Sequence, residues 1–325
     1  MQREYDQMVF EVMESGLHTT VQDLGRYGYQ QYGISPAGAM DDVSYQLGNI
    51  LLGNPRNAAS LEITMVGPTL KALKDTIISI TGANLSPSLD GKTVDMWRNI
   101  LVEKGQTLRF GKPVAGARAY LAVIGGIHVP EVMGSKSTYV KGNFGGMNGR
   151  PLAERDIVEA SNVPTDYKSM TRKKLSKDAQ PSFLGKIRVV QGPQWDHFTE
   201  GAIHDFLNSP FTITNQSDRM GYRLQGNMGI ALRDQGRKEM ITDPVAKGSI
   251  QVPKNGSPII LMSDRQTTGG YPKIANVISA ELYKVAQRLP GEQIVFEKVS
   301  VVEAQRQWRN REKLFRQLEL GVALR

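Results

Sequence analysis

Short runs of β-forming residues recur along this 325-residue chain, and turn-forming residues separate them. The chain contains 33 glycines and 16 prolines, many of which stand between the runs. Asp90-Gly91, between two such runs, is the signature of a tight hairpin. Many short strands divided by turns predict a mostly β, barrel-like architecture. The clearest runs are 8–12, 76–80, 118–124, 187–190, 257–262 and 293–296.

Few segments carry helical signals. Asp41 or Asp42 can cap a helix that ends at Gly53. Ser300 and Glu303 form a capping box at the start of a second helix near the end of the chain. Apolar residues spaced by three and four positions more often indicate core packing than a partner groove. The apolar faces comprise Val43, Leu47, Ile50 and Leu51 in the first helix, and Val301, Ala304, Trp308, Phe315 and Leu318 in the second.

A polar stretch at 161–182 divides the chain. It contains two prolines and a cluster of Lys and Arg, without apolar periodicity. A chain of 325 residues can bury a sizeable core and commonly forms one large or two medium domains. We expect a β-rich N-terminal lobe at 1–165, a linker at 166–182, and a barrel-like C-terminal lobe at 183–325 that ends in the second helix.

The formal net charge of +8 raises the question of a nucleic-acid partner. The basic residues are spread along the chain, however, and are not gathered with aromatic residues into one stripe. Local clusters such as 172–174 are typical of solvated faces. We therefore expect no nucleic-acid partner, whereas an acidic protein or an anionic substrate fits the charge.

The chain has no cysteine and four histidines. Without cysteine, disulfides, thiolate nucleophiles and Cys-ligated zinc are excluded. The histidines show no i, i+4 pair, so we expect no metal site. The N-terminus is acidic where a signal peptide would be apolar, and the longest apolar run, 119–127, is too short to span a bilayer. We expect a cytoplasmic protein without a membrane partner.

A glycine-rich stretch at 20–29 is the first candidate for a binding site. Gln22, Asp23 and Arg26 offer an amide, a carboxylate and a guanidinium within five residues, and the glycines let the backbone approach a ligand. An Asp–Arg pair that braces a glycine-rich loop explains the same residues equally well. Both interpretations stay open.

A second stretch, 134–150, combines glycines with hydroxyl groups. Ser135, Ser137 and Thr138 lie beside Lys136, where a nest of backbone amides could bind an oxyanion. A serine nucleophile is less expected, because the chain has no GxSxG motif. The alternating run 61–68 adds Glu62, which is either a general base facing inward or a solvent-facing side chain.

A third stretch, 257–271, delivers polar side chains from an apolar strand into a double-glycine turn, as binding loops do. A fourth stretch, 217–224, gathers ionic groups around one glycine. The candidates in these two stretches are Asp218, Arg219, Asp264, Gln266, Thr267, Gly269 and Gly270.

Nucleotide motifs are absent in their usual form. Gly91-Lys92-Thr93 imitates the end of a phosphate-binding loop, but it falls in the expected hairpin and position 86 is serine rather than glycine. The chain also has no GxGxxG motif. If ATP is used, we expect a partner to bring much of its site.

Together these motifs resemble the KipA family, also called allophanate hydrolase subunit 2 or the C subunit of 5-oxoprolinase, and the equivalent region of urea carboxylase. The resemblance implies cyclophilin-like β-barrel lobes and a KipI-type partner subunit. It also implies either ATP-dependent opening of 5-oxoproline to glutamate, with a third subunit, or carboxyl transfer from biotin to a urea-like acceptor. The segments that carry it are 20–26, 38–41, 61–64, 120–126, 134–139, 217–224 and 266–271.

We therefore hypothesise a subunit of an ATP-dependent 5-oxoprolinase whose substrate carries an amide or ureido group. Asp23, Asp218 and Asp264 are the candidate acid/base groups. The substrate-binding candidates are Gln22, Arg26, Ser135, Ser137, Thr138, Arg219, Gln266, Thr267, Gly269 and Gly270.

Two alternatives accompany this hypothesis. One is the carboxyltransferase subunit of a biotin-dependent carboxylase, with biotin carried by another protein because this chain lacks a Met-Lys-Met motif. The other is a regulatory antagonist that sequesters a KipI-type inhibitor of a histidine kinase.

Overall fold

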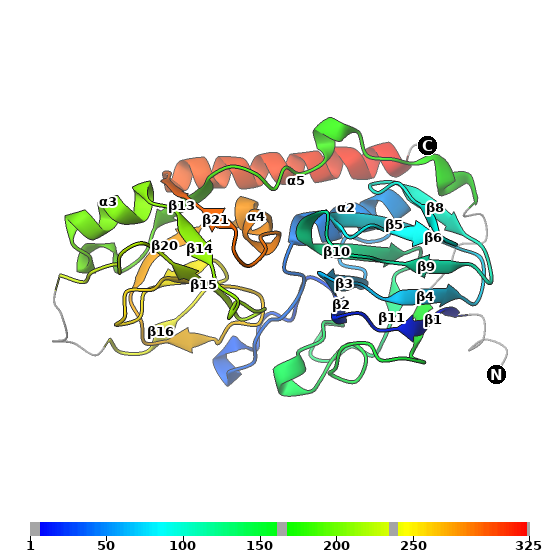
Figure 1. Ribbon diagram of the computed structural model, residues 1–325, viewed down its shortest axis with the longest axis horizontal. Coiled ribbons are helices and arrows are strands. Elements are labelled where there is room, and N and C mark those ends of the chain that lie inside the picture. The colour runs from blue at the N-terminus through cyan, green and yellow to red at the C-terminus, as the bar shows by residue number, and fades with distance from the viewer. Residues whose placement is uncertain (1–6, 161–167, 234–239, 324–325) are drawn as a thin grey trace. The chain divides into compact units, whose positions relative to one another are not determined.

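The computed structural model of this chain describes residues 7–160, 168–233 and 240–323. The chain forms two compact units, each built from more than one stretch of sequence (Figure 1). Unit 1 comprises Met1–Arg26, Ala37–Ser182 and Lys313–Arg325, and unit 2 comprises Tyr27–Pro36 and Phe183–Glu312. The continuous lobes and linker expected from the sequence stay a prediction, from which this division differs by assigning 27–36 to unit 2 and 313–325 to unit 1.

Unit 1 contains two antiparallel sheets. The seven-stranded sheet has the order β11-β12-β1-β4-β9-β6-β7, and the five-stranded sheet has the order β2-β3-β10-β5-β8. The first sheet consists of β1 (Met8–Glu14), β4 (Thr69–Ala72), β6 (Ser88–Leu89), β7 (Lys92–Thr93), β9 (Thr107–Arg109), β11 (Ile127–His128) and β12 (Ile157–Ala160). The second consists of β2 (His18–Gln22), β3 (Ser60–Thr64), β5 (Thr76–Asn84), β8 (Asn99–Val102) and β10 (Ala115–Val123).

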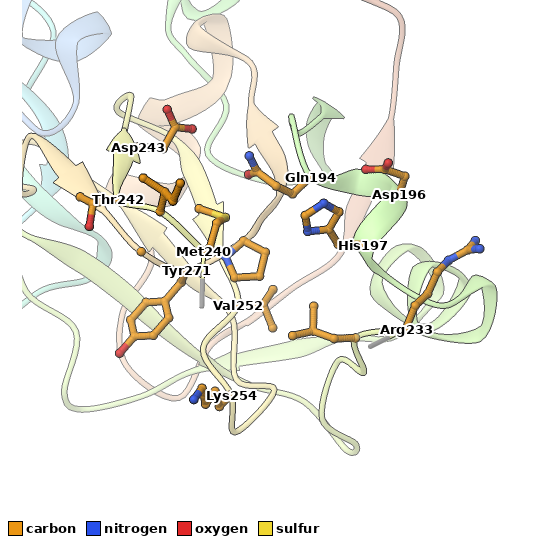
Figure 2. Close-up of a pocket in the computed structure, with 14 residues that line it drawn as sticks. Gln194, Asp196, His197, Arg233, Met240, Thr242, Asp243, Val252, Lys254 and Tyr271 are labelled. Carbon is orange, nitrogen blue, oxygen red and sulfur yellow. The ribbon is translucent and has the colours of Figure 1, made fainter. Parts of the chain in front are cut away.

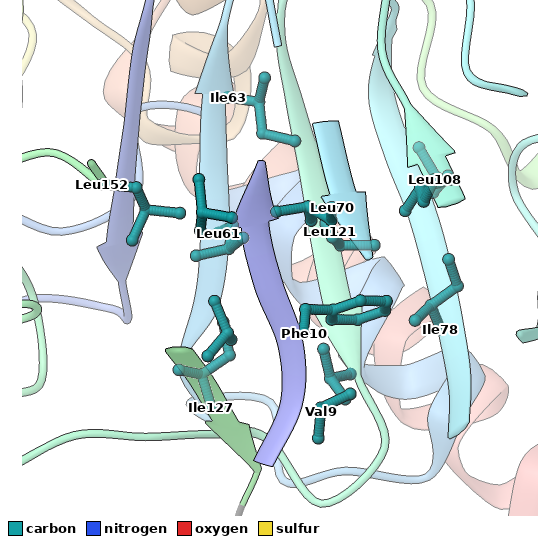
Figure 3. Packing of buried hydrophobic residues seen from close by; sticks show 14 of the residues in the cluster. Val9, Phe10, Leu61, Ile63, Leu70, Ile78, Leu108, Leu121, Ile127 and Leu152 are labelled. Carbon is teal, nitrogen blue, oxygen red and sulfur yellow. The ribbon is translucent and has the colours of Figure 1, made fainter. Parts of the chain in front are cut away.

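One apolar core is shared by the two sheets of unit 1. Figure 3 shows Phe10 of β1 and Leu70 of β4 packed with Leu61 of β3 and Leu121 of β10. Because side chains alternate along a strand, Tyr120 of β10 belongs to a different cluster on the opposite face of its sheet. Burial on both faces explains why β10 reads as an almost continuous apolar run.

Helix α2 (Asp42–Leu52) packs against β5 and β10. The Asp41 carboxylate accepts hydrogen bonds from the first-turn amides of Val43 and Ser44, and Gly53 ends the helix in the left-handed conformation. The expected helix is therefore confirmed. The hydroxyl of Thr81 donates to the Ser44 carbonyl oxygen at 2.7 Å, which ties the helix to β5.

The hairpin between β6 and β7 is also as expected. Ser88 pairs with Thr93 and Leu89 with Lys92, which leaves Asp90 and Gly91 as the two turn residues. Their φ angles are 48° and 78°, and a two-residue turn with both φ positive matches the twist of the flanking strands.

Unit 2 contains one large sheet that almost closes on itself. Its order is β21-β14-β15-β18-β17-β20-β13-β22, and the two edge strands are consecutive in sequence with only Val295 between them. The strands are β13 (Ile187–Gln191), β14 (Phe211–Ile213), β15 (Gly221–Gln225), β17 (Ser249–Gln251), β18 (Ile259–Leu261), β20 (Lys273–Val277), β21 (Gln293–Ile294) and β22 (Phe296–Lys298). A two-stranded sheet pairs β16 (Asp243–Pro244) with β19 (Thr268–Gly269).

Aromatic side chains fill part of unit 2. Phe206 of helix α3 (Glu200–Asn208) stacks on Phe296 of β22, with ring centroids 4.6 Å apart, and Phe211 of β14 packs against both rings. Unit 2 also contains α4 (Leu282–Ala286). The predicted mostly β, barrel-like fold is confirmed.

Helix α5 (Val301–Ala323) begins as the capping box predicted, because the Ser300 hydroxyl accepts a hydrogen bond from the Glu303 amide at 3.1 Å. Its expected apolar stripe is buried only in part. Phe315 is fully buried beneath the Arg56 guanidinium, whereas Val301 and Trp308 are 59% and 47% exposed. The interpretation of the whole stripe as core packing is therefore wrong at those two positions.

Candidate functional site

Asp23 is the centre of a dense hydrogen-bond cluster in unit 1. Its Oδ1 accepts from the Gly25 amide at 2.7 Å and from the hydroxyls of Ser135 and Ser137 at 2.7 and 2.5 Å. Its Oδ2 accepts from the Lys136 amide at 2.6 Å. Two motifs separated by more than 100 residues therefore meet at one carboxylate.

Arg26 holds the same loop from another direction. Its guanidinium donates to the carbonyl oxygens of Ser137 and Val132, and it lies over the Phe144 ring at 4.8 Å. The side chain is only 1% exposed. Gly145 makes room for it, since an added Cβ there would lie 2.8 Å from a terminal nitrogen of Arg26 and 2.1 Å from the Ser137 oxygen.

Gln22 and Thr138 complete this cluster. The Gln22 amide nitrogen donates to the Thr20 hydroxyl at 3.0 Å and to the Thr138 carbonyl at 3.2 Å. The Thr138 hydroxyl donates to the Val21 carbonyl at 2.9 Å. All six unit 1 candidates thus lie in one buried network between the end of β2 and the loop that contains Ser135.

A second buried network adjoins the start of α2. Glu62 is 1% exposed, and its Oε2 accepts from the Met40 amide and the Tyr120 hydroxyl, each at 2.8 Å. The Tyr120 hydroxyl accepts in turn from the Asp41 amide at 2.8 Å. Burial, followed by the negative charges of Glu62 and Asp41, raises the pKa of Tyr120 well above its usual value. Glu62 therefore faces inward, a question that the sequence alone had left open.

The two networks are in direct contact through the backbone. The Ala39 amide donates to the Asp23 carbonyl at 2.9 Å, and a Cβ on Gly38 would lie 2.9 Å from the backbone of Leu24. The charge of Asp23 also reaches Tyr45 of α2, whose pKa is raised first by burial and then by this carboxylate. The turn before α2 and the Asp23 loop therefore hold each other in place.

The candidates Arg219 and Asp264 form a buried ion pair in unit 2. Arg219 Nε donates to one carboxylate oxygen of Asp264 at 3.0 Å and a terminal nitrogen donates to the other at 2.9 Å. The side chains are 9% and 7% exposed. Asp218, by contrast, is exposed, and its carboxylate accepts from the Met220 and Gly221 amides in a turn.

The double-glycine turn lies beside this pair in sequence. Gln266 donates to the Gln251 side chain at 3.3 Å, and the Thr267 carbonyl accepts from the Val245 amide at 3.1 Å. An added Cβ on Gly269 would lie 2.4 Å from the Gln251 amide nitrogen, so a larger residue there would require the Gln251 side chain to shift.

Gly270 lines a pocket of about 1000 Å³ in unit 2 (Figure 2). Most of its lining was not predicted from the sequence, including Gln194, His197, Arg233 and Asp243. The lining comes from five separate stretches, and only the one that contains the Gly269-Gly270 turn provided a signal.

The predicted site residues therefore form two groups. The group in unit 1 consists of Gln22, Asp23, Arg26, Ser135, Ser137 and Thr138, and the group in unit 2 consists of Asp218, Arg219, Asp264, Gln266, Thr267, Gly269 and Gly270.

Neither a metal cluster nor a membrane-crossing helix is found in the part of the chain that the structure describes. Within 7–160, 168–233 and 240–323, no three His, Asp or Glu side chains are grouped as metal ligands. Over the same residues, no helix combines the length and apolar character needed to cross a bilayer.

The chain is similar to proteins of known family over nearly its whole length. The family model described as carboxyltransferase domain, subdomain A and B, matches residues 32–298. The C subunit of 5-oxoprolinase from Escherichia coli (strain K12) is 39% identical over 310 residues, which cover 95% of this chain and 97% of that protein. The protein of the same name from Haemophilus influenzae is 38% identical and covers 91% of this chain and 93% of its own length.

Solved structures show the same relationship. The Kluyveromyces lactis urea carboxylase superposes with a TM-score of 0.89 at 31% identity, over 97% of this chain but only 30% of that larger chain. The match with the family model and with full-length relatives covers both units. This chain therefore belongs to the carboxyltransferase domain family, subdomains A and B, together with the C subunits of 5-oxoprolinase.

Proposed function

We propose that this chain is the C-type subunit of an ATP-dependent 5-oxoprolinase complex that converts 5-oxoproline to glutamate. Support comes from the 39% identity to the C subunit of a 5-oxoprolinase along 97% of that protein. The structural observation that carries the proposal is the buried cluster around Asp23, where a carboxylate is held by two serine hydroxyls and two backbone amides.

Asp23 has a divided role in this proposal. Oδ1 accepts three hydrogen bonds and fixes the loop, whereas Oδ2 accepts only the bond from Lys136 among the described residues. A carboxylate oxygen has two lone pairs, so Oδ2 retains one for a proton of water or substrate. Asp23 is therefore the leading candidate for the acid/base group of lactam opening.

The loop around Ser137 has a supporting role. Its amides already donate within the chain, from Lys136 to Asp23, from Ser137 to the Ser135 hydroxyl, and from Thr138 to the Val21 carbonyl. We therefore assign this loop to positioning Asp23 rather than to binding an oxyanion. The Gly269-Gly270 turn remains the candidate for oxyanion binding.

We also assign a structural role, rather than a catalytic one, to the pair of Arg219 and Asp264. Two parallel hydrogen bonds join the Arg219 guanidinium to the two carboxylate oxygens of Asp264, and we assign this bidentate pair to holding the loop rather than to proton transfer. The pair begins the turn that continues to Gln266 and Gly270, so it fixes the base of that loop. Asp218 caps the turn on the other side of Arg219.

We assign the binding of ATP to the assembled complex. The phosphate-loop imitation at Gly91-Lys92-Thr93 does not fit a nucleotide, because these residues form the exposed end of a β-hairpin and precede no helix. We propose that the enzyme is completed by a KipI-type subunit and a third subunit. A cytoplasmic location is part of the proposal and agrees with the absence of cysteine.

A carboxyltransferase subunit of a biotin-dependent carboxylase is the second candidate function. The observation that favours it is the TM-score of 0.89 to the urea carboxylase structure over 97% of this chain. Because this chain has no Met-Lys-Met motif, biotin would be attached to another protein.

Reconstitution separates these functions. This chain, its KipI-type partner and the third subunit are mixed with 5-oxoproline and ATP, and glutamate release is measured with each protein omitted in turn. Release that requires this chain supports the oxoprolinase. Well-folded, associated subunits that release no glutamate overturn it. Carboxylation of a urea-like acceptor by carboxybiotin would then support the second function, and tight partner binding without any turnover would support the regulatory alternative.

A further inference from the structure

Arg265 of unit 2 is a buried cation without a carboxylate partner among the described residues. It is 6% exposed. Its Nε donates to the Val245 carbonyl at 3.3 Å, and one terminal nitrogen donates to the Met262 carbonyl at 3.4 Å. The second terminal nitrogen has no acceptor within 7–160, 168–233 and 240–323. Two neutral carbonyls therefore hold a guanidinium whose charge no described carboxylate balances.

A second buried arginine of unit 2 shows the contrast. Arg219 makes two hydrogen bonds to the Asp264 carboxylate. Taking a guanidinium out of water without an opposite charge costs free energy, and the cost falls when a carboxylate is supplied. Burial accordingly lowers the pKa of Arg265, while the nearby Tyr27 phenol acts in the opposite direction. A carboxylate from outside this chain would remove the cost of burying Arg265.

A tyrosine-rich loop, residues 27–33, lies close enough to Arg265 for Tyr27 to affect its charge. Tyr27 is 61% exposed and Tyr32 is 71% exposed. The chain that follows the loop is fastened to the strand end before Arg265, because the buried Ser35 hydroxyl donates to the Ser263 carbonyl at 3.3 Å. Exposed tyrosine rings are therefore presented beside the buried guanidinium.

Hydrogen bonds within the loop order it. The Gln30 side-chain oxygen accepts from the Gly28 amide at 2.8 Å. The Gly33 amide donates to the Gln30 carbonyl at 2.9 Å, which closes a 3-10 turn. A loop that is ordered before a partner arrives loses less conformational entropy on binding, so more of the contact energy contributes to affinity.

The surroundings of Arg265 suit a protein surface rather than a small molecule. Arg265 does not line the pocket of Figure 2, and the next residue, Gln266, is exposed. Tyrosine and arginine are enriched among the residues that carry most of the binding energy in protein interfaces. The net charge of +8 also favours a partner with acidic groups.

We propose that Arg265 and the tyrosine-rich loop form a docking surface for a protein partner that inserts an aspartate or glutamate carboxylate against the guanidinium. The carboxylate accepts from the second terminal nitrogen of Arg265, and Tyr27 and Tyr32 contact the partner beside it. The inference rests on the proposed function, because we take the partner to be the KipI-type subunit of that complex.

Calorimetric titration of the full-length chain with the KipI-type subunit, without 5-oxoproline or ATP, tests the proposal. Arg265→Gln should weaken association about tenfold or more, because it leaves the partner's carboxylate buried without its cation. Arg265→Lys keeps the charge but loses the paired geometry, so it should recover only part of the affinity. Arg223→Gln, at an exposed arginine of β15, is the matched control and should bind as the unaltered chain does.

Thermal unfolding of the isolated chain separates docking from a structural role. Arg219→Gln takes the cation away from Asp264 and should lower the unfolding temperature. Arg265→Gln removes a charge that has no described carboxylate partner, so it should lower that temperature less. A larger loss in Arg265→Gln than in Arg219→Gln would overturn the proposal, because the guanidinium would then hold the fold.

Tyr27→Ala provides a second reading if Arg265→Gln does not fold, since Tyr27 is exposed, and it should also weaken association. An unaltered chain that does not bind the KipI-type subunit contradicts the proposed complex together with the surface. Equal binding by the unaltered chain, Arg265→Gln and Tyr27→Ala overturns the surface alone and leaves the proposed function standing. Saturable binding of inorganic phosphate that Arg265→Gln abolishes would also overturn the proposal, because Arg265 would then serve a free anion.

Discussion

The hydroxyl of Tyr120 donates a 2.8 Å hydrogen bond to Glu62, and neither side chain is more than 1% exposed. The same hydroxyl accepts from the Asp41 amide, and Glu62 also accepts from the Met40 amide. One buried pair on two adjacent strands thus fixes two successive amides of the turn that begins α2. Since this turn also contacts the backbone of Asp23, the pair acts on the candidate site through the backbone.

Tyr120→Phe should destabilise the protein by about 1–3 kcal/mol, because it removes a buried hydroxyl that accepts from the Asp41 amide and donates to Glu62. The free energy of unfolding from urea denaturation measures this change. Tyr32→Phe is the control, since Tyr32 is 71% exposed and its loss of a hydroxyl should change stability by less than about 0.5 kcal/mol. Equal effects of the two substitutions would show that the Tyr120 hydroxyl does not support the fold.

Stability should fall with rising pH above the ordinary tyrosine pKa of 10.0. Burial raises the pKa of folded Tyr120, so below pH 10 both states keep the proton, and above it the unfolded chain ionises first. The stabilisation is then lost as pH rises through the folded pKa. Urea midpoints between about pH 9 and about pH 11 should decline less steeply for Tyr120→Phe than for the unaltered chain. Parallel curves would contradict this assignment.

Glu281→Gln should cost about 3 kcal/mol near neutral pH, because it leaves Arg188 and Lys284 without their shared buried carboxylate. Burial alone would raise the pKa of Glu281, but hydrogen bonds from Arg188 and Lys284 lower it below 4.5. The contribution is therefore present above about pH 4.5 and is lost as pH falls through the folded pKa. Acid unfolding monitored by circular dichroism should be less pH-dependent in the variant.

An exposed carboxylate provides the comparison for Glu281. Glu14 pairs with Arg109 at 3.0 Å, but the side chains are 58% and 60% exposed. Solvent screens such a pair, so Glu14→Gln should leave unfolding near neutral pH almost unchanged. If Glu14→Gln lost as much stability as Glu281→Gln, burial would not be what distinguishes the two carboxylates.

Gly145→Ala should destabilise unit 1 by about 2–4 kcal/mol, since φ is +74° and a Cβ would lie 2.1 Å from the Ser137 oxygen. Gly91→Ala tests the backbone effect alone, because its φ is +78° but nothing lies within 4 Å of an added Cβ. We expect Gly91→Ala to lower the free energy of unfolding by about 1–2 kcal/mol. Thermal and urea unfolding of both variants measure the difference, and equal costs would mean that the crowding at Ser137 is relieved by small shifts.

Asp23→Ala should abolish glutamate release by the reconstituted complex, whereas Asp95→Ala, at an 83% exposed carboxylate, should not. The double substitution Ser135→Ala with Ser137→Ala separates two roles of Asp23, because it removes the hydroxyl donors and keeps the carboxylate. If Asp23 transfers a proton, turnover per folded complex should fall further in Asp23→Ala than in the serine variant. Equal losses would restrict Asp23 to holding the loop.

The features predicted well from sequence are those set by neighbours in the chain. Asp41 caps α2 through amides two and three residues ahead, and Gly53 ends it in a conformation that glycine adopts readily. Asp90 and Gly91 are likewise sufficient to specify their turn. These signals need no knowledge of what packs against the segment.

The features missed depend on contacts between distant segments. Asp23 and Ser135 were separate candidates, but their hydrogen bond spans 112 positions and no local pattern encodes it. Alternation placed Glu62 opposite Leu61, yet its burial depends on Tyr120 and on the turn before α2, which cover that face. The same limit applies to Trp308, whose spacing on α5 suggested burial although the side chain is 47% exposed.

The near-closure of the large sheet in unit 2 has a consequence for synthesis of the chain. Among the residues that the structure describes, β12 is the last strand of unit 1, so these strands have all left the ribosome once Ala160 has emerged. The sheet of unit 2 begins at β13 but is joined at both edges by β21 and β22, the last strands to be made. Until translation passes residue 298, β13 can pair with β20 and β14 with β15, but the outer edges of β13 and β14 still lack β22 and β21, so for that interval the sheet of unit 2 carries open edges.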